Sequence, residues 1–107
     1  MGDVSSIRPF KVTGTLTIDK ASWLQSSLLE RFAATEGIVL DLGGVLDIDM
    51  SCLQVLYAAR RHATKTGKTF SMTGKLSPRL ARRLSQCGFA GGILERGEDL
   101  EKALVGY

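Results

Sequence analysis

The chain has 107 residues, of which 44% are hydrophobic and 23% charged, and its formal net charge at pH 7 is +3. This composition predicts one globular domain over residues 1–107. Cys52 and Cys87 are too few for a disulfide framework, and both fall in helical apolar patterns where free cysteine packs as a small hydrophobe. No apolar run approaches the roughly 18 residues of a membrane span, and no signal pattern opens the chain. We therefore expect a cytoplasmic protein without membrane insertion.

The net charge conceals a strong asymmetry along the chain. Residues 50–94 carry eight basic side chains and no Asp or Glu. We expect a contiguous positive surface that steers an acidic partner, formed by Arg60, Arg61, Arg79, Arg82 and Arg83. Segment 60–83 offers only Phe70 as an aromatic and no nucleic-acid reader motif, so no nucleic-acid partner is expected.

The first third of the chain predicts a strand followed by a helix. Apolar residues occupy even positions from Phe10 to Ile18, a period of two, with Gly14 as a kink or tight turn. Asp19 is the expected N-cap of a helix from Lys20 to about Thr35. Gly37 is expected to close that helix, whose apolar face would consist of Ala21, Leu24, Leu28 and Phe32.

The middle of the chain predicts a second strand and a second helix. The β-branched, apolar stretch at residues 37–42 is typical of a strand buried on both faces. A helix is expected from about Ser51 to Thr66, with Gly67 as its C-terminal stop. Its inward face would consist of Cys52, Val55, Leu56, Ala59 and Ala63.

The remaining elements repeat this alternation. Residues 68–74 predict a strand, and residues 77–88 a helix with Ser77 as N-cap and Pro78 in its first turn. Residues 91–95 predict a short strand and residues 98–105 a closing helix. The inward residues of these two helices would be Leu80, Leu84 and Cys87, and Leu100, Ala103 and Leu104. Alternating strands and helices predict an α/β domain with a small, mostly parallel sheet and about four helices.

Motifs for catalysis are weak in this chain. Residues 66–69 read TGKT, like the tail of a phosphate-binding loop, but His62 stands where that loop needs a glycine. His62 is the only histidine and is expected at the surface, so no metal site, cofactor or enzymatic activity is predicted.

Two carboxylates and a serine lie between the second strand and the second helix. Asp47 and Asp49 could act as an acid/base pair or hold a hard cation. Alternatively, they lie in the loop at the positive end of the helix, with Asp49 as a cap. Ser51 could also be a cap, or it could expose its hydroxyl at the carboxyl end of a parallel strand, where α/β proteins place their sites. A phosphate on Ser51 would change the local charge sharply.

These segments together resemble the STAS domain of anti-sigma-factor antagonists. The resemblance rests on IVLDLGGV, DIDMSCLQVL, SPRLARRLSQCGF and GTLTIDKASWL, and it covers about residues 10–105. The family motif Asp-Ser-Ser-Gly-Leu falls on Asp49, Met50, Ser51, Cys52 and Leu53. Its Gly-Glu-Leu-Asp segment falls on residues 14–17, where Thr17 replaces an acid of the family's partner surface.

The resemblance implies a non-enzymatic module of signalling and transcription regulation that switches partners when Ser51 is phosphorylated. The implied partners are a GHKL-type serine kinase, which doubles as an anti-sigma factor, and a phosphatase. A constitutive interaction subunit of a chemotaxis-type cluster or a lipid-transport ATPase complex is the alternative. Helical spacing puts Met50, Leu53 and Tyr57 on a flank away from the core face, and we expect part of this strip to dock the partner. Asp47 and Asp49 would shape the same surface.

Overall fold

Three strands form one parallel sheet in the order β1-β2-β3. The strands are β1 (Pro9–Leu16), β2 (Gly37–Ile48) and β3 (Thr69–Thr73). The structure is a computed structural model that describes residues 9–86 and 95–105, with side chains to residue 102. Phe10 pairs with Leu40, and Ile38 pairs with Phe70. The α/β class and the parallel sheet predicted from the sequence are confirmed.

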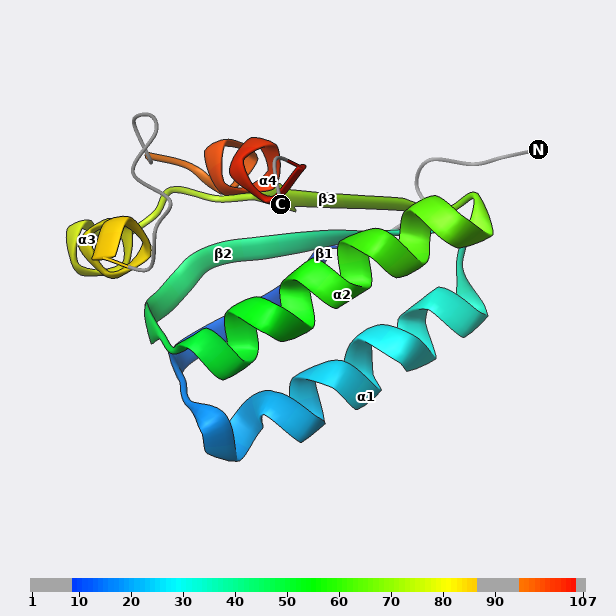
Figure 1. Cartoon of the computed structure of the whole chain (residues 1–107), viewed down its shortest axis with the longest axis horizontal. Helices are drawn as coiled ribbons and strands as arrows, with labels where there is room; N and C mark the ends of the chain where they lie inside the picture. Colours follow the sequence, from blue (N-terminus) through cyan, green and yellow to red (C-terminus); the bar gives the residue numbers. More distant parts are fainter. Residues whose placement is uncertain (1–8, 87–94, 106–107) are drawn as a thin grey trace.

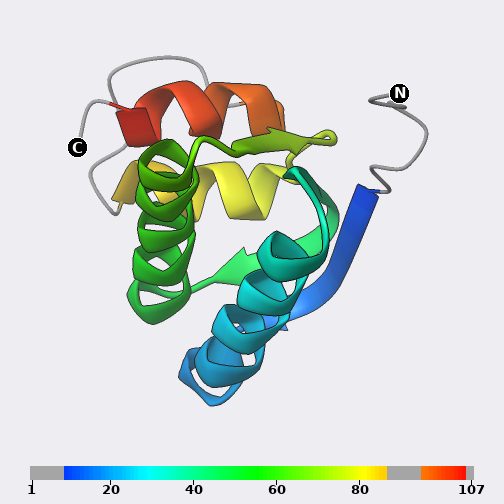
Figure 2. The same cartoon turned by 90° about the vertical axis from the view of Figure 1, so that its right-hand side faces the viewer.

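Four helices surround the sheet in the described part of the chain. They are α1 (Ile18–Ala34), α2 (Met50–Thr66), α3 (Pro78–Gln86) and α4 (Gly97–Val105). Helices α1 and α2 lie side by side on one face and run in the same direction, because each returns from the end of a parallel strand (Figure 1). Helix α4 lies along β3 and α3 packs near the carboxyl end of β2 (Figures 1 and 2).

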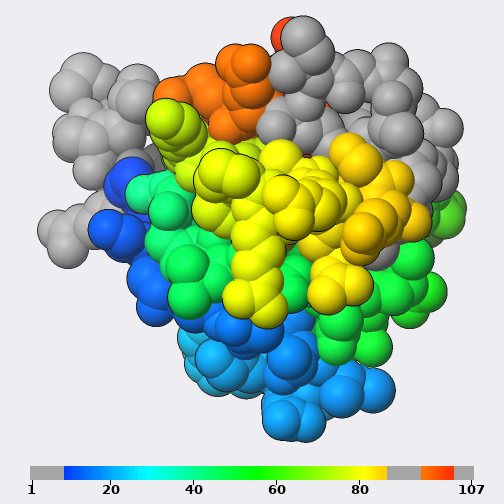
Figure 3. All heavy atoms as spheres, turned by 90° about the vertical axis from the view of Figure 1, so that its left-hand side faces the viewer, coloured from blue at the N-terminus to red at the C-terminus, as the bar shows by residue number. Residues whose placement is uncertain are grey.

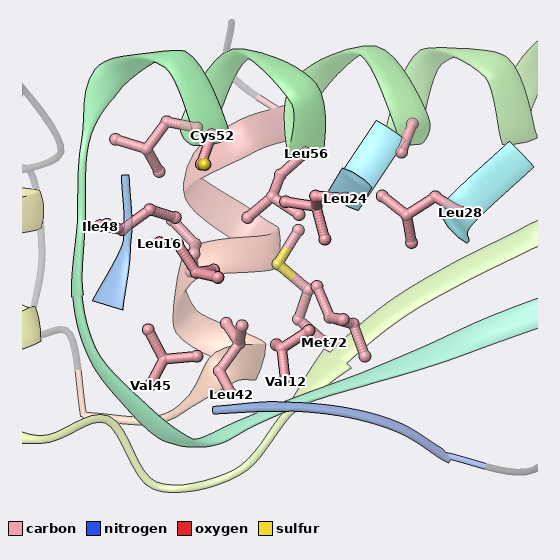
Figure 4. Close-up of a cluster of buried hydrophobic side chains, with 14 of the residues drawn as sticks. Val12, Leu16, Leu24, Leu28, Leu42, Val45, Ile48, Cys52, Leu56 and Met72 are labelled. Atoms are coloured by element: carbon pink, nitrogen blue, oxygen red, sulfur yellow. The ribbon is translucent and has the colours of Figure 1, made fainter. Parts of the chain in front are cut away.

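The core lies between the sheet and the α1–α2 layer. Side chains of β1 and β2 such as Val12 and Leu42 meet Leu24 and Leu56 of the two helices, and Met72 of β3 completes the contact (Figure 4). Leu24, Leu40 and Leu56 have no exposed surface. Burying side chains of this size contributes about 1.5–3 kcal/mol each to folding, so this layer holds α1 and α2 in place.

Glycines bend the first two strands. Gly14 has φ 81°, a conformation open to glycine, and it lies at one of two register shifts between β1 and β2. This confirms the expected kink. Strand β2 continues to Ile48, whereas the sequence predicted an end at Leu42. At Gly44 a Cβ would lie only 2.7 Å from Thr13 Cγ2, so the absence of a side chain there allows β2 to pair closely with β1.

The helix ends agree in part with the predictions. Gly67 adopts the left-handed conformation and ends α2, and the Ser77 hydroxyl accepts the Leu80 N–H at the start of α3. Asp19 is not the N-cap of α1, which begins at Ile18 after Thr17. Asp19 lies in the first turn, where a carboxylate favours the helix dipole without capping it. Gly37 opens β2 instead of closing α1, which ends at Ala34 with Thr35 as C-cap.

Some predictions fall outside the described residues. These are residues 91–94 of the strand expected at 91–95, the inward position of Cys87, and the side chains of Ala103 and Leu104. Leu100 is buried, as expected. Across residues 9–86 and 95–105, no helix combines the length and hydrophobicity needed to cross a bilayer.

Candidate functional site

Helix α2 is capped by Asp49 and not by Ser51. The Asp49 carboxylate accepts the Cys52 N–H at 3.2 Å, and the Leu53 N–H donates to the Asp49 carbonyl. The predicted cap of Asp49 is confirmed. The alternative in which Ser51 is the cap is wrong, because the helix begins one residue earlier than expected, at Met50. Ser51 is therefore the second residue of the helix.

Ser51 is partly exposed at the carboxyl end of the sheet. The Asp49 N–H donates to the Leu16 carbonyl at 3.0 Å, which ties the start of α2 to the end of β1. No side-chain hydrogen bond joins the Ser51 hydroxyl to the described residues. A hydroxyl without such a bond, at the positive end of a helix, is open to an added phosphate.

Three large apolar side chains are exposed around this end of the molecule. Ile18 is 67% exposed, Leu46 55% and Met50 48%. Ile18 begins α1, Leu46 lies at the second register shift between β1 and β2, and Met50 begins α2. We call Ile18, Leu46, Met50 and Ser51 the docking end; Figure 3 views the molecule from this side, with α3 in yellow above β2 and the start of α1.

Sequence reasoning identified only part of the docking end. Part of the strip Met50, Leu53 and Tyr57 was expected to be exposed, and Met50 is, at 48%. Ile18 was read as the last inward residue of a strand, but the helix starts at Ile18 and turns it outward. Leu46 had no signal in the sequence, because alternation would turn an apolar residue inward and the following Asp47 outward, whereas Val45 and Asp47 are buried and Leu46 is exposed.

The predicted strip of Met50, Leu53 and Tyr57 is not a single surface. Leu53 is 2% exposed and belongs to the core, so its assignment to partner binding is wrong. Leu53 faces inward because the start of α2 packs closely on the end of β1. Tyr57 is partly buried against the core, with the Arg61 guanidinium 5.9 Å from its ring centroid.

Asp47 is a buried charge and not half of a carboxylate pair. Its side chain is 9% exposed and lies in two ion pairs, with Arg83 at 3.0 Å and Arg79 at 3.4 Å. It also accepts the Ile48 N–H at 2.9 Å. The hydrogen bond from Arg83 lowers the pKa of Asp47, and burial opposes this only in part. Asp47 thus joins β2 to α3, and its assignment to an exposed partner surface is wrong.

This arrangement predicts an acid-sensitive contact. Because the folded pKa of Asp47 is depressed, its stabilisation is present above the unfolded pKa of about 3.9 and is lost as pH falls through the folded pKa. Asp47→Asn should lower the free energy of unfolding by about 1–2 kcal/mol at pH 7. The loss is no larger because both guanidiniums are exposed enough for solvent to screen the ion pairs. The difference from wild type should vanish near pH 2. Urea unfolding across this range measures it, with exposed Glu36→Gln as control; an equal gap at both ends would contradict the assignment.

The expected contiguous positive surface is interrupted by ion pairs. Arg79 and Arg83 are bound to Asp47, and Arg60 donates to Glu101 at 3.1 Å and to the Phe70 carbonyl at 3.0 Å. Carboxylates distant in sequence reach these arginines only in the folded chain. Of the five arginines in the expected surface, Arg61 and Arg82 are exposed and have no carboxylate partner among the described residues.

Thr17 and Cys52 connect the starts of the two helices. The Thr17 carbonyl accepts the Cys52 Sγ–H at 3.3 Å, and Cys52 is fully buried, as the sequence predicted. Burial, reinforced by the nearby Asp49 carboxylate, raises the pKa of the Cys52 thiol. The thiol is therefore neutral and serves packing in place of nucleophilic chemistry.

A groove runs along the seam of α1 and α2, away from the sheet. Its volume is about 390 Å³, and Ser51 lines it together with Leu29, Gln54, Ala58 and His62. His62 is half-buried, in contrast to the expected surface position, because its ring packs 5.1 Å from that of Phe32. Within residues 9–86 and 95–105, no three His, Cys, Asp or Glu side chains gather as metal ligands would.

The protein is a small α/β domain with a parallel sheet, and its candidate site lies at the carboxyl ends of the strands. The family model described as "Mlab, STAS domain" matches residues 9–96. The chain therefore belongs to the STAS domain family, which confirms the resemblance seen in the sequence.

Solved structures agree with this fold. A sulfate transporter family protein from Wolinella succinogenes is 23% identical, with a TM-score of 0.61 over 94% of this chain and 88% of the other. A structure described as Mglu is 17% identical, with a TM-score of 0.54 over 65% of this chain, which spans only 17% of the Mglu chain. No curated protein matches the sequence.

Proposed function

We propose that this STAS domain is a non-enzymatic binding module whose partner exchange is controlled by phosphorylation of Ser51. The observation that carries the proposal is the division of roles between Asp49 and Ser51: the aspartate caps α2, so the serine hydroxyl has no capping duty. A serine held in the first helical turn beside exposed apolar side chains is a suitable target for a kinase.

The exposed residues of the docking end supply the binding surface. Ile18, Leu46 and Met50 offer apolar area that folding leaves unburied, and such patches are typical of protein interfaces. The partner class is a GHKL-type serine kinase acting as anti-sigma factor, with a phosphatase that restores the binding form. The module would act in the cytoplasm, as part of transcription regulation.

A constitutive interaction subunit is the second candidate. The matching family model bears the name Mlab, and one similar structure is a sulfate transporter family protein. Met50 and Cys52 also replace the first serine and the glycine of the family's phosphorylated motif. In this role the docking end would hold a transport ATPase or a signalling scaffold permanently, and Ser51 would stay unmodified.

Incubation with ATP and a candidate GHKL-type kinase separates the two candidates. We expect intact-mass spectrometry to show the addition of one phosphoryl group to the wild type and none to Ser51→Ala. Ser27→Ala, a variant of a half-buried serine of α1, is the matched control and should be modified like the wild type. Stable binding with no modification of the wild type would favour the constitutive subunit.

A further inference from the structure

We propose that the α1–α2 groove is a second docking site, which takes an amphipathic helix with acidic side chains from the partner protein. The proposal rests on the proposed function only in that it assigns a second contact to the same partner. It extends the binding surface from the docking end along the outer side of α2, through Ser51, which belongs to both.

The groove has the length and chemistry of a helix-binding site. From Ser51 to His62 it follows α2 over twelve residues, a rise of about 16 Å, which matches about three turns of a docked helix. Leu29 is 48% exposed on the α1 side, and Ala58 is exposed on the α2 side. A small residue facing a large one leaves a depression that an apolar side chain can fill.

The charge beside the groove selects an acidic occupant. Helix α2 contains no carboxylate, and Arg61 and Lys65 are exposed in its last two turns, near the His62 end. Neither of these two cations pairs with a carboxylate in the described part of the chain. Acidic side chains on the occupant would meet them, and this complementarity would increase the association rate and fix the orientation.

A second copy of this chain is a poorer occupant. Its own α2 would bring Arg61 and Lys65 and no carboxylate to the interface, and like charges across an interface oppose association. Helix α1 does not correct this, because its two acids, Asp19 and Glu30, are balanced by Lys20 and Arg31.

A synthetic helix tests the groove without knowledge of the partner. The probe is a peptide of roughly four turns with leucines at every third or fourth position and glutamates elsewhere. Titrated into isotope-labelled protein, it should shift the amide resonances of Leu29, Gln54, Ala58 and His62. A matched peptide with lysines in place of the glutamates should bind at least roughly tenfold more weakly.

Variants at exposed positions sharpen the test. Leu29→Glu and Ala58→Glu should abolish the shifts while preserving a dispersed spectrum, since neither side chain is in the core. Arg61→Glu combined with Lys65→Glu should reverse the preference between the two peptides. Trp23→Glu, which changes a side chain of α1 that is 50% exposed and lies outside the groove, is the matched control and should bind like the wild type.

Several outcomes would overturn the inference. They are no shift at millimolar peptide, equal binding of the lysine peptide, shifts confined to the docking end, or a dimer detected by light scattering that Leu29→Glu dissociates. The kinase experiment fails or succeeds independently, because the groove is tested with unmodified protein and a synthetic peptide.

Discussion

Ser51→Asp is expected to weaken binding of the partner kinase by about 2 kcal/mol or more, roughly thirtyfold, while Ser51→Ala binds like the wild type. The reason is desolvation: a carboxylate at this position would be buried against the partner beside Met50, with the Asp49 carboxylate already nearby. A phosphate, with about −1.5 to −2 charges, should have a larger effect than aspartate.

The same substitution should not harm the fold. At the second position of α2 a negative charge interacts favourably with the helix N-terminus, by about 0.3–1 kcal/mol. Surface-based binding kinetics together with thermal unfolding measure both effects, and they should have opposite signs. Ser85→Asp, which adds the same charge at an exposed position of α3, is the control. Wild-type affinity for Ser51→Asp would contradict the proposed switch.

Leu56→Ala is expected to destabilise the domain by about 2–5 kcal/mol, because Leu56 is fully buried where α2 meets the sheet and the lost methylene groups leave a cavity (Figure 4). Leu46→Ala makes the same chemical change at a side chain that is 55% exposed, and it should alter stability by less than about 0.5 kcal/mol. Denaturant unfolding measures both.

For partner affinity, the order of the two effects should be reversed, with the larger loss at Leu46. Leu46→Ala should reduce partner affinity at least about fivefold, corresponding to roughly 1 kcal/mol, since Leu46 is held at the surface by the strand and offers its area to a partner. Leu56→Ala, measured under conditions where it is folded, should bind normally. A Leu46→Ala variant with unchanged affinity would remove Leu46 from the docking end.

The sequence by itself determined the fold, because that information is local and periodic. Alternating strand and helix patterns, the glycine at position 67, the Ser77 cap and the apolar face of α2 each specify an element through neighbours a few residues away. It also placed Ser51 at the start of α2 and Asp49 as the cap, both within one residue of the helix start.

Only the tertiary structure decided how the charges and apolar side chains near Ser51 are used. Asp47 meets Arg83 across 36 positions of sequence, and Arg60 meets Glu101 across 41, so no local pattern could show that these charges are paired. Ile18 and Leu53 take the opposite of their expected positions: Ile18 is exposed, and the buried face of α2 includes Leu53, whereas Val55 is only partly buried. Sequence spacing fixes which residues share a helix face, at about 100° per residue. Only the packing of α1 and α2 on the sheet decides which face is buried.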